Sequence, residues 1–151
     1  MKSGSKDIVA KVLTSTHRRL FSLTGGRIGG ALAGMPVLVL TTTGRRSGRP
    51  RQTMLTSPVQ EGERLVLVAS YGGDDRHPQW FLNLRHDPDV LVTMGGATKA
   101  MRARVATANE KAQLWDAVTA SYQGYGGYQR RTDRDIPLVL LDPVTTIDDR
   151  H

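Results

Sequence analysis

Cysteine is absent from this chain of 151 residues, and histidine occurs only four times. The lack of cysteine excludes disulfide bonds, thiolate catalysis and zinc sites built from cysteine. The histidines do not show the spacing of metal ligands, so we expect no metal site. No apolar run approaches the ~20 residues that a membrane helix needs, and no secretory signal is visible. We therefore expect a cytoplasmic protein.

Acidic residues are missing between Asp7 and Glu61. The first 60 residues hold ten lysines and arginines and one acid, a net charge of +9, whereas the rest of the chain carries −2. This asymmetry indicates a polyanionic partner: a phosphate group, a nucleic acid or an anionic membrane surface. The alternative is a protein that is basic overall without such a partner.

The length predicts a single domain, preceded by a segment of different character. Residues 1–30 combine a basic amphipathic helix over about 6–23 with two glycine pairs that end it. This helix would allow peripheral contact with the inner face of a membrane. Residues 31–151 form the domain proper.

Short strands dominate the pattern of the domain. We expect strands at 37–43, 52–59, 64–70, 90–94, 99–105 and 137–141, most of them joined by hairpins. A short helix around Trp80 and a longer one, from an N-cap at Asn109 to about Tyr122, accompany them. The βαβ alternation of a Rossmann sheet is missing. The pattern predicts a mainly β, α+β fold in which an antiparallel sheet closes as a barrel.

An arginine-rich turn separates the first two expected strands and runs from Gly44 to Arg51 as GRRSGRPR. Arginine presents a planar fork that fits phosphate or carboxylate oxygens, and glycine lets backbone amides approach a ligand. The turn therefore indicates a phosphate-binding site. Two alternatives stay open: a solvated basic hairpin loop, and arginines that enter a DNA minor groove as in an AT-hook.

A second candidate segment reads Ala69-Ser70-Tyr71-Gly72-Gly73, where a strand ends in a glycine loop. Such a strand end offers free amides and close backbone approach, and Ser70 would hydrogen-bond a ligand. A simple turn is the alternative. Asp74 and Asp75 follow directly, and adjacent residues on an extended loop diverge, so we do not expect an acid/base pair.

Aromatic residues are scarce, yet three of the four tyrosines cluster at Tyr122, Tyr125 and Tyr128, interleaved with glycines. The glycines predict that no stable helix forms, so we expect a mobile aromatic flap. Such a flap suits a flat apolar substrate, which the hydroxyls would orient. The alternative is that the rings pack on the core. Trp80 likewise either walls a planar ring or, as is more common, belongs to the core.

Taken in order, these segments resemble the deazaflavin-dependent nitroreductase family of actinobacteria, also called F420H2-dependent quinone reductases. The resemblance spans about Leu20 to Pro143 and rests on Val37–Arg51, Val68–Gly73, Pro78–Leu84, the tyrosine cluster and Thr132–Pro137. It implies a split β-barrel of the FMN-binding type. It also implies coenzyme F420, in which a deazaflavin ring carries a ribityl chain, a phosphate and a poly-glutamate tail. That tail accounts for the arginine-rich turn better than DNA does, so we expect no nucleic-acid partner.

The resemblance also implies roles for individual residues. The phosphate and tail would be held by Arg45, Arg46, Ser47 and Arg51. The deazaflavin would be lined by Ala69, Ser70, Gly72 and Gly73 and flanked by Trp80. The three tyrosines would border the substrate. Tyr71 stands where family members often carry a lysine, so an aromatic surface would replace a cationic contact.

The implied activity is hydride transfer from the reduced coenzyme to an electron-poor small molecule: a quinone, a nitroaromatic or an activated enone. The protein would contribute positioning and electrostatics, and Ser70 or a tyrosine hydroxyl would stabilise the developing oxyanion. The alternative is a non-catalytic protein that binds F420 or a fatty acid on the same fold. Both a monomer and a homodimer are compatible with the sequence.

Overall fold

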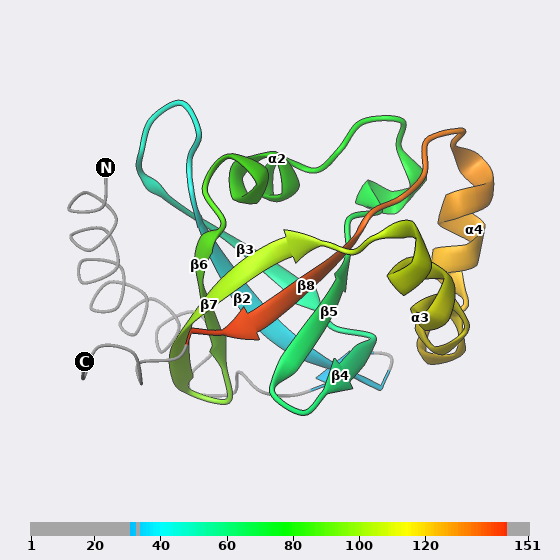
Figure 1. Ribbon diagram of the computed structural model, residues 1–151, viewed down its shortest axis with the longest axis horizontal. Coiled ribbons are helices and arrows are strands. Elements are labelled where there is room, and N and C mark those ends of the chain that lie inside the picture. The colour runs from blue at the N-terminus through cyan, green and yellow to red at the C-terminus, as the bar shows by residue number, and fades with distance from the viewer. Residues whose placement is uncertain (1–30, 33, 145–151) are drawn as a thin grey trace.

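The computed structural model describes residues 31–32 and 34–144, which form one curled antiparallel sheet flanked by helices (Figure 1). The strands are β1 (Ala31–Leu32), β2 (Met35–Thr43), β3 (Pro50–Thr56), β4 (Val59–Glu61), β5 (Arg64–Val68), β6 (Asp89–Met94), β7 (Ala97–Val105) and β8 (Leu138–Pro143). The helices are the 3-10 turn η1 (Tyr71–Gly73), α2 (Gln79–His86), α3 (Ala108–Ser121) and α4 (Gly124–Arg131). The mainly β, antiparallel architecture expected from the sequence is confirmed.

The strands follow the order β1-β2-β6-β7-β8-β5-β4, and β3 pairs with β2 beside this path. Strand β2 is central because it pairs with β3 along seven residues and with β6 along three. The β2–β3 hairpin closes at Thr43 and Pro50, so the arginine-rich turn projects from the end of the longest pairing. A rigid ladder thus carries the candidate anion site.

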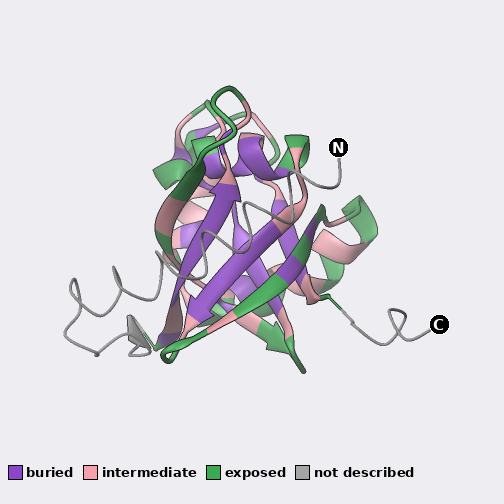
Figure 2. Ribbon diagram, turned by 90° about the vertical axis from the view of Figure 1, so that its left-hand side faces the viewer, coloured by how far each residue is buried: buried purple, intermediate pink, exposed green. Residues whose placement is uncertain are grey.

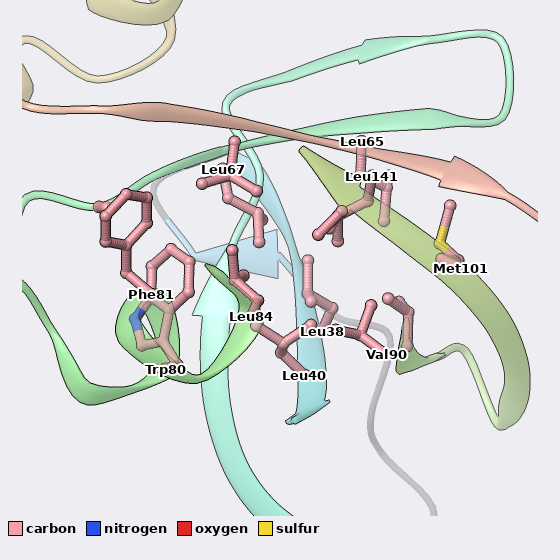
Figure 3. Close-up of a cluster of buried hydrophobic side chains, with 14 residues drawn as sticks. Leu38, Leu40, Leu65, Leu67, Trp80, Phe81, Leu84, Val90, Met101 and Leu141 are labelled. Carbon is pink, nitrogen blue, oxygen red and sulfur yellow. The ribbon is translucent and has the colours of Figure 1, made fainter. Parts of the chain in front are cut away.

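The main core lies inside the curled sheet (Figures 2 and 3). Strands contribute Leu38, Leu40, Leu65, Leu67 and Leu141, and α2 contributes Trp80, Phe81 and Leu84 from the open side, as Figure 3 shows. Helix α2 is therefore anchored by its apolar stripe, which fixes its polar side chains relative to the β2–β3 turn.

A second core lies on the other face of β5 and β8. Successive strand residues point to opposite faces, so Leu65 and Leu67 enter the main core whereas Val66 and Val68 pack beneath α3 and α4. Val118 of α3 and Tyr125 of α4 complete this cluster. The tyrosine segment is thereby attached to β8 and to β5, the strand that leads into the Ser70 loop.

The prediction of one continuous strand over 52–59 is wrong, since this segment is divided between β3 and β4. At the break, the buried hydroxyl of Ser57 donates to the carbonyls of Val59 and Val66, and the Ser57 amide donates to Pro36. Pro58 has no amide hydrogen for a ladder. The chain therefore crosses from the β2 side of the sheet to the β5 side at this point.

Helix α3 begins two residues earlier than expected, because its N-cap is Thr107 and not Asn109. The Thr107 hydroxyl accepts from the Glu110 amide, and the Glu110 carboxylate accepts from the Thr107 amide, which forms a capping box. Arg104 also donates to Glu110, and these contacts lower the pKa of Glu110 to about 2. Tyr122 is the C-cap residue.

The expectation that the glycines prevent a helix in the tyrosine segment is also wrong, since residues 124–131 form helix α4. Tyr125 is buried, and the rings of Tyr122, Tyr125 and Tyr128 contact one another in pairs. Packing of these rings outweighs the unfavourable helix propensity of the glycines, which amounts to about 1 kcal/mol for each. Figure 1 shows α4 beside α3 at one end of the sheet.

The helix expected over 6–23, and with it the segment 1–30, lies outside the described residues. Within residues 34–144, no helix combines the length and apolar character needed to cross a membrane. The same part of the chain contains no group of three or more histidine, aspartate or glutamate side chains placed to hold a metal ion.

Candidate active site

The arginine-rich turn is closed by its own backbone. The Gly44 amide donates to the Arg49 carbonyl at 2.8 Å, and the Gly48 amide donates to the Gly44 carbonyl at 2.8 Å. A Cβ at Gly44 would lie 2.8 Å from the Ser47 hydroxyl oxygen and 3.4 Å from Arg51 Nε. A side chain at this position would therefore displace the Ser47 hydroxyl and crowd the Arg51 side chain.

Helix α2 holds one arginine of this turn in place. The Asn83 side-chain oxygen accepts from the Arg45 amide at 3.2 Å and from Arg45 Nη1 at 2.9 Å. Gln79 accepts from Arg45 Nη2 at 2.9 Å, and the Asn83 amide group donates to the Thr42 hydroxyl at 3.3 Å. The partners of Arg45 are neutral amides, so the guanidinium is oriented while its positive charge stays uncompensated.

A basic pocket of about 430 Å³ lies between the turn and α2. Arg45, Arg46, Ser47 and Arg51 line it together with Gln79 and Asn83, and no carboxylate belongs to its lining. The Ser47 hydroxyl accepts from the Arg49 amide at 3.1 Å, so its own proton can serve a ligand in the pocket. Arginine forks without an acidic partner suit a phosphate or carboxylate group.

An aromatic cavity of about 850 Å³ adjoins the basic pocket. Both are bordered by Thr53, Gln79 and Trp80, so together they form one groove with a charged end and an aromatic end. Trp80 is buried at 7% exposure and also borders both spaces, so it serves the core and the groove at once. Met54 and Tyr71, which are 58% and 51% exposed, stand at the rim of the cavity.

Three tyrosine rings form one wall of the aromatic cavity. The Tyr122 and Tyr125 rings meet edge to face at 5.1 Å, and the Tyr122 and Tyr128 hydroxyls are 3.5 Å apart. The Tyr125 hydroxyl lies 3.2 Å from the hydroxyl of Thr56. Burial raises the pKa of Tyr125, and the hydrogen bond with Tyr122 raises the pKa of Tyr128. Both phenols are therefore protonated, and able to donate, at neutral pH.

The Ser70 turn also lines the aromatic cavity. Ser70 is buried, and the next three residues have positive φ: 47° at Tyr71, 65° at Gly72 and 85° at Gly73. A Cβ at Gly73 would lie 2.9 Å from the Tyr128 carbonyl oxygen, so this turn packs directly on α4. The left-handed path turns Ser70, Tyr71 and Gly72 toward the cavity.

The fold gathers most of the site residues that we expected. Arg45, Arg46, Ser47 and Arg51 surround the basic pocket. Ser70, Tyr71, Gly72 and the three tyrosines surround the aromatic cavity, and Trp80 borders both. Ala69 and Gly73 line neither space, because Ala69 lies in the main core and Gly73 faces α4.

Sequence reasoning missed the polar residues of α2. Gln79 and Asn83 lie one helical turn apart, and Asn83 is buried on the stripe that carries Trp80 and Leu84. An asparagine on an apolar stripe is a signal that could have been noticed, because a buried amide needs partners. Its partner Arg45 is 38 residues away in the chain.

The adjacent aspartates Asp74 and Asp75 each have a structural partner. Asp74 accepts two hydrogen bonds from the Arg76 guanidinium, which lower the pKa of Asp74 to about 2. Asp75 accepts from the Thr132 hydroxyl at 2.6 Å. These carboxylates stabilise the loop before α2 and do not converge on the groove.

A family model for the F420H(2)-dependent quinone reductases matches residues 13–143. The chain belongs to this family. An F420H(2)-dependent quinone reductase of Mycobacterium tuberculosis is 38% identical over 133 residues, which are 85% of this chain and 89% of the relative. The family named from the sequence alone is therefore confirmed.

Solved structures of similar chains share the fold of this F420H(2)-dependent quinone reductase family member. The F420-H2 dependent reductase FDR-A is 35% identical, covers 71% of this chain and 94% of its own, and superposes with a TM-score of 0.65. A second solved chain, described as a domain-swapped dimer, is 31% identical, covers 89% and 98%, and has a TM-score of 0.66. The split β-barrel expected from the resemblance is confirmed, and the family is one of F420-dependent oxidoreductases.

Proposed function

We propose that this quinone reductase family member uses reduced F420 to reduce an electron-poor small molecule in the aromatic cavity. The observation that supports it best is the shape and chemistry of the groove. One end is lined by three arginines without a carboxylate, the other by four tyrosines, and Trp80 borders both. A ligand with an anionic tail and a flat ring matches both ends.

Coenzyme F420 fits the residues present. Its phosphate and glutamates are oxygen anions, which the forks of Arg46 and Arg51 and the hydroxyl of Ser47 would bind. Arg45, held by Asn83 and Gln79, would add a fixed positive charge. A Cβ at Gly44 would crowd Ser47 and Arg51, two of the residues that would bind these anions. The deazaflavin ring would lie in the aromatic cavity, beside Trp80 and the Ser70 turn.

The chain itself contributes orientation, exclusion of water and proton supply. When bound, the reduced coenzyme supplies a hydride, and the protein provides the geometry for its transfer. The tyrosine rings and Met54 would cover a flat quinone, nitroaromatic or enone acceptor and keep water away from it. The protonated hydroxyls of Tyr125 and Tyr128, with Ser70 and Tyr122, would donate to the oxygen on which charge develops.

A titration with F420 tests the binding step. Coenzyme absorbance or fluorescence should report a dissociation constant in about the micromolar range or tighter. An absence of binding at low salt would contradict the proposal. Oxidation of the reduced coenzyme with menadione as acceptor then separates an enzyme from a protein that only binds F420 or a lipid.

Replacing Arg46 or Arg51 by alanine should weaken coenzyme binding with little effect on folding. Both side chains are exposed and line the basic pocket, and a charge-assisted hydrogen bond contributes about 1.5–3 kcal/mol. We expect the dissociation constant to rise about tenfold or more for each variant. Titrations and thermal unfolding of the same samples measure the two effects.

Arg102→Ala is the matched control, because Arg102 is an exposed arginine of β7 whose ion pair is with Asp89, away from the groove. The dissociation constant of the Arg102→Ala variant for F420 should equal that of the wild type. Equal effects of all three substitutions would mean that the arginine-rich turn acts only through the overall charge of the protein.

We also propose that the protein is cytoplasmic, with peripheral membrane contact through its basic N-terminal segment, and acts as a monomer or a homodimer. The domain-swapped dimer of a similar chain supports the second assembly. Size-exclusion chromatography with light scattering separates the two. Sedimentation with anionic vesicles tests the membrane contact.

A further inference from the structure

Arg134 lies behind the Ser70 turn and lines neither part of the groove. Its guanidinium donates to the backbone oxygens of Ala69 at 3.1 Å, Ser70 at 2.9 Å and Asp74 at 2.9 Å. It also contacts Nδ1 of His77 at 3.2 Å, and because arginine only donates, this nitrogen accepts. One side chain thus ties together the whole loop between β5 and α2.

The positive charge of Arg134 is directed at these carbonyls. None of the ion pairs among the described residues involves this side chain. Burial lowers the pKa of Arg134, yet a guanidinium stays protonated at neutral pH. A half-buried ion without a direct salt bridge needs other groups to stabilise it. Here the strand-end carbonyls supply hydrogen-bonding dipoles, and the nearby carboxylates of Asp74 and Asp75 add attraction at longer range.

The Ser70 turn presents its backbone amides on the side away from Arg134. The backbone of Ser70 has a right-handed helical conformation, with φ −81° and ψ −33°, and the backbones of Tyr71 and Gly72 have positive φ, in the left-handed region. Such a succession brings consecutive N–H groups together in a concave nest that attracts negative charge. Within residues 34–144, no hydrogen-bond acceptor is found for the amides of Ser70, Tyr71 and Gly72. All three residues line the aromatic cavity.

Arg134 and this nest act on the same peptide groups. The Ala69 carbonyl shares a peptide group with the Ser70 amide, and the Ser70 carbonyl shares one with the Tyr71 amide. A cation bound to the oxygen polarises the peptide, which makes its N–H a stronger donor. The left-handed conformation of Tyr71 also costs energy and persists only where its surroundings enforce it.

We propose that Arg134 is a positioning residue that holds and polarises the Ser70–Gly72 amide nest, which binds a carbonyl oxygen of the flat ring in the aromatic cavity. The inference rests on the proposed function, which assigns the deazaflavin ring to this cavity. Arg134 touches no ligand. It acts through the Ala69 and Ser70 carbonyls, and its loss should weaken ring binding while the basic pocket stays intact.

The test compares Arg134→Gln and Arg134→Lys in the full chain, with oxidised F420 as the probe. Glutamine removes the charge, and we expect the dissociation constant to rise about tenfold, as for the loss of a charge-assisted hydrogen bond. Lysine keeps the charge but cannot bridge three carbonyls, so its effect should be smaller, about threefold. Arg64→Gln is the control, because Arg64 is a half-buried arginine at the other end of β5 that pairs with Asp142.

Added guanidinium chloride distinguishes a local electrostatic role from a general structural one. At low, non-denaturing concentration it should restore affinity in Arg134→Gln, whereas sodium chloride of equal ionic strength should not. The wild type and Arg64→Gln should show no gain. A folded Arg134→Gln with unchanged affinity, or a loss that guanidinium does not reverse, would overturn the inference.

If Arg134→Gln does not fold, the test rests on Arg134→Lys. A folded Arg134→Lys variant that binds F420 with wild-type affinity would overturn the inference. The proposed function fails in a different way, because then the wild type itself does not bind F420. Wild-type binding with unaffected Arg134 variants removes only the role of Arg134.

Discussion

At the scale of single residues, Gly73 shows how the groove constrains the chain. It is buried, has a φ of 85°, and a Cβ there would lie 2.9 Å from the Tyr128 carbonyl oxygen and 3.1 Å from Arg131 Cβ. The resemblance assigned Gly73 to the deazaflavin, whereas the structure turns it toward α4. A glycine that looks like a ligand-binding residue in the sequence is here the contact between two walls of the groove.

Gly73→Ala should lower the free energy of unfolding by about 2–4 kcal/mol, which sums the left-handed strain of a non-glycine residue and the overpacking against α4. Gly62→Ala is the control, since Gly62 has a φ of 63° but nothing within 4 Å of its added Cβ. It should lose only about 1–2 kcal/mol. Urea unfolding measures the stability of both variants. Equal losses of stability would show that crowding of the added Cβ against Tyr128 has no energetic cost.

At the scale of elements, local patterns predicted the strands and α2 well but failed where contacts distant in the chain decide. The apolar runs of β2, β5 and β8 are long enough to identify buried strands without further information. Helix α4 contains three glycines in eight residues, so its local propensity opposes a helix. It forms because the tyrosine rings pack on α3 and the second core, which no local pattern reveals.

The start of α3 gives an element-level prediction. Thr107→Ala removes the capping box and should lower the free energy of unfolding by about 1 kcal/mol. Asn109→Ala is the control, because Asn109 lies exposed in the first turn, where alanine is the better helix former. It should be neutral or slightly stabilising. Thermal unfolding of both variants measures the two changes in stability. A larger loss of stability for Asn109→Ala than for Thr107→Ala would support Asn109 as the N-cap, as expected from the sequence.

At the scale of the whole molecule, the groove is assembled from segments far apart in the chain. The β2–β3 turn, α2, the Ser70 turn and α4 each contribute a wall, and the sheet with its two cores sets their spacing. Figure 1 shows these segments along one side of the sheet. The coenzyme and acceptor sites are therefore expected to be lost together on unfolding.

The pH dependence of stability is a property of the whole molecule. Burial lowers the pKa of His77 from its ordinary 6.5, and arginine or lysine partners lower those of Asp74, Glu110 and Glu63. In each case the unfolded chain binds protons more readily than the folded one. Stability should therefore fall as the pH drops below about 6.5, and fall further as the carboxylates titrate from about 4.5 toward 2.

Urea unfolding at a series of pH values checks this dependence. His77→Gln keeps an acceptor for Arg134 but cannot take up a proton. It should therefore remove the first decline in stability, which begins below about pH 6.5, and retain the second. If the free energy of unfolding has the same pH dependence in the wild type and in His77→Gln, the first decline belongs to another titrating group.

The sequence by itself determined the family, the antiparallel barrel, and the arginines and aromatic residues that border the groove, because hydrophobic alternation, turn chemistry and the arginine-rich motif are local features of the chain. Only the tertiary structure decided that the tyrosine segment is a helix, that Asn83 and Gln79 hold Arg45, and that Arg134 lies behind Ser70. Each of these depends on partners between 34 and 69 residues apart in the sequence, such as Arg45 and Gln79 or Thr56 and Tyr125. Packing and hydrogen bonds at that separation exist only after the sheet has brought its edges together.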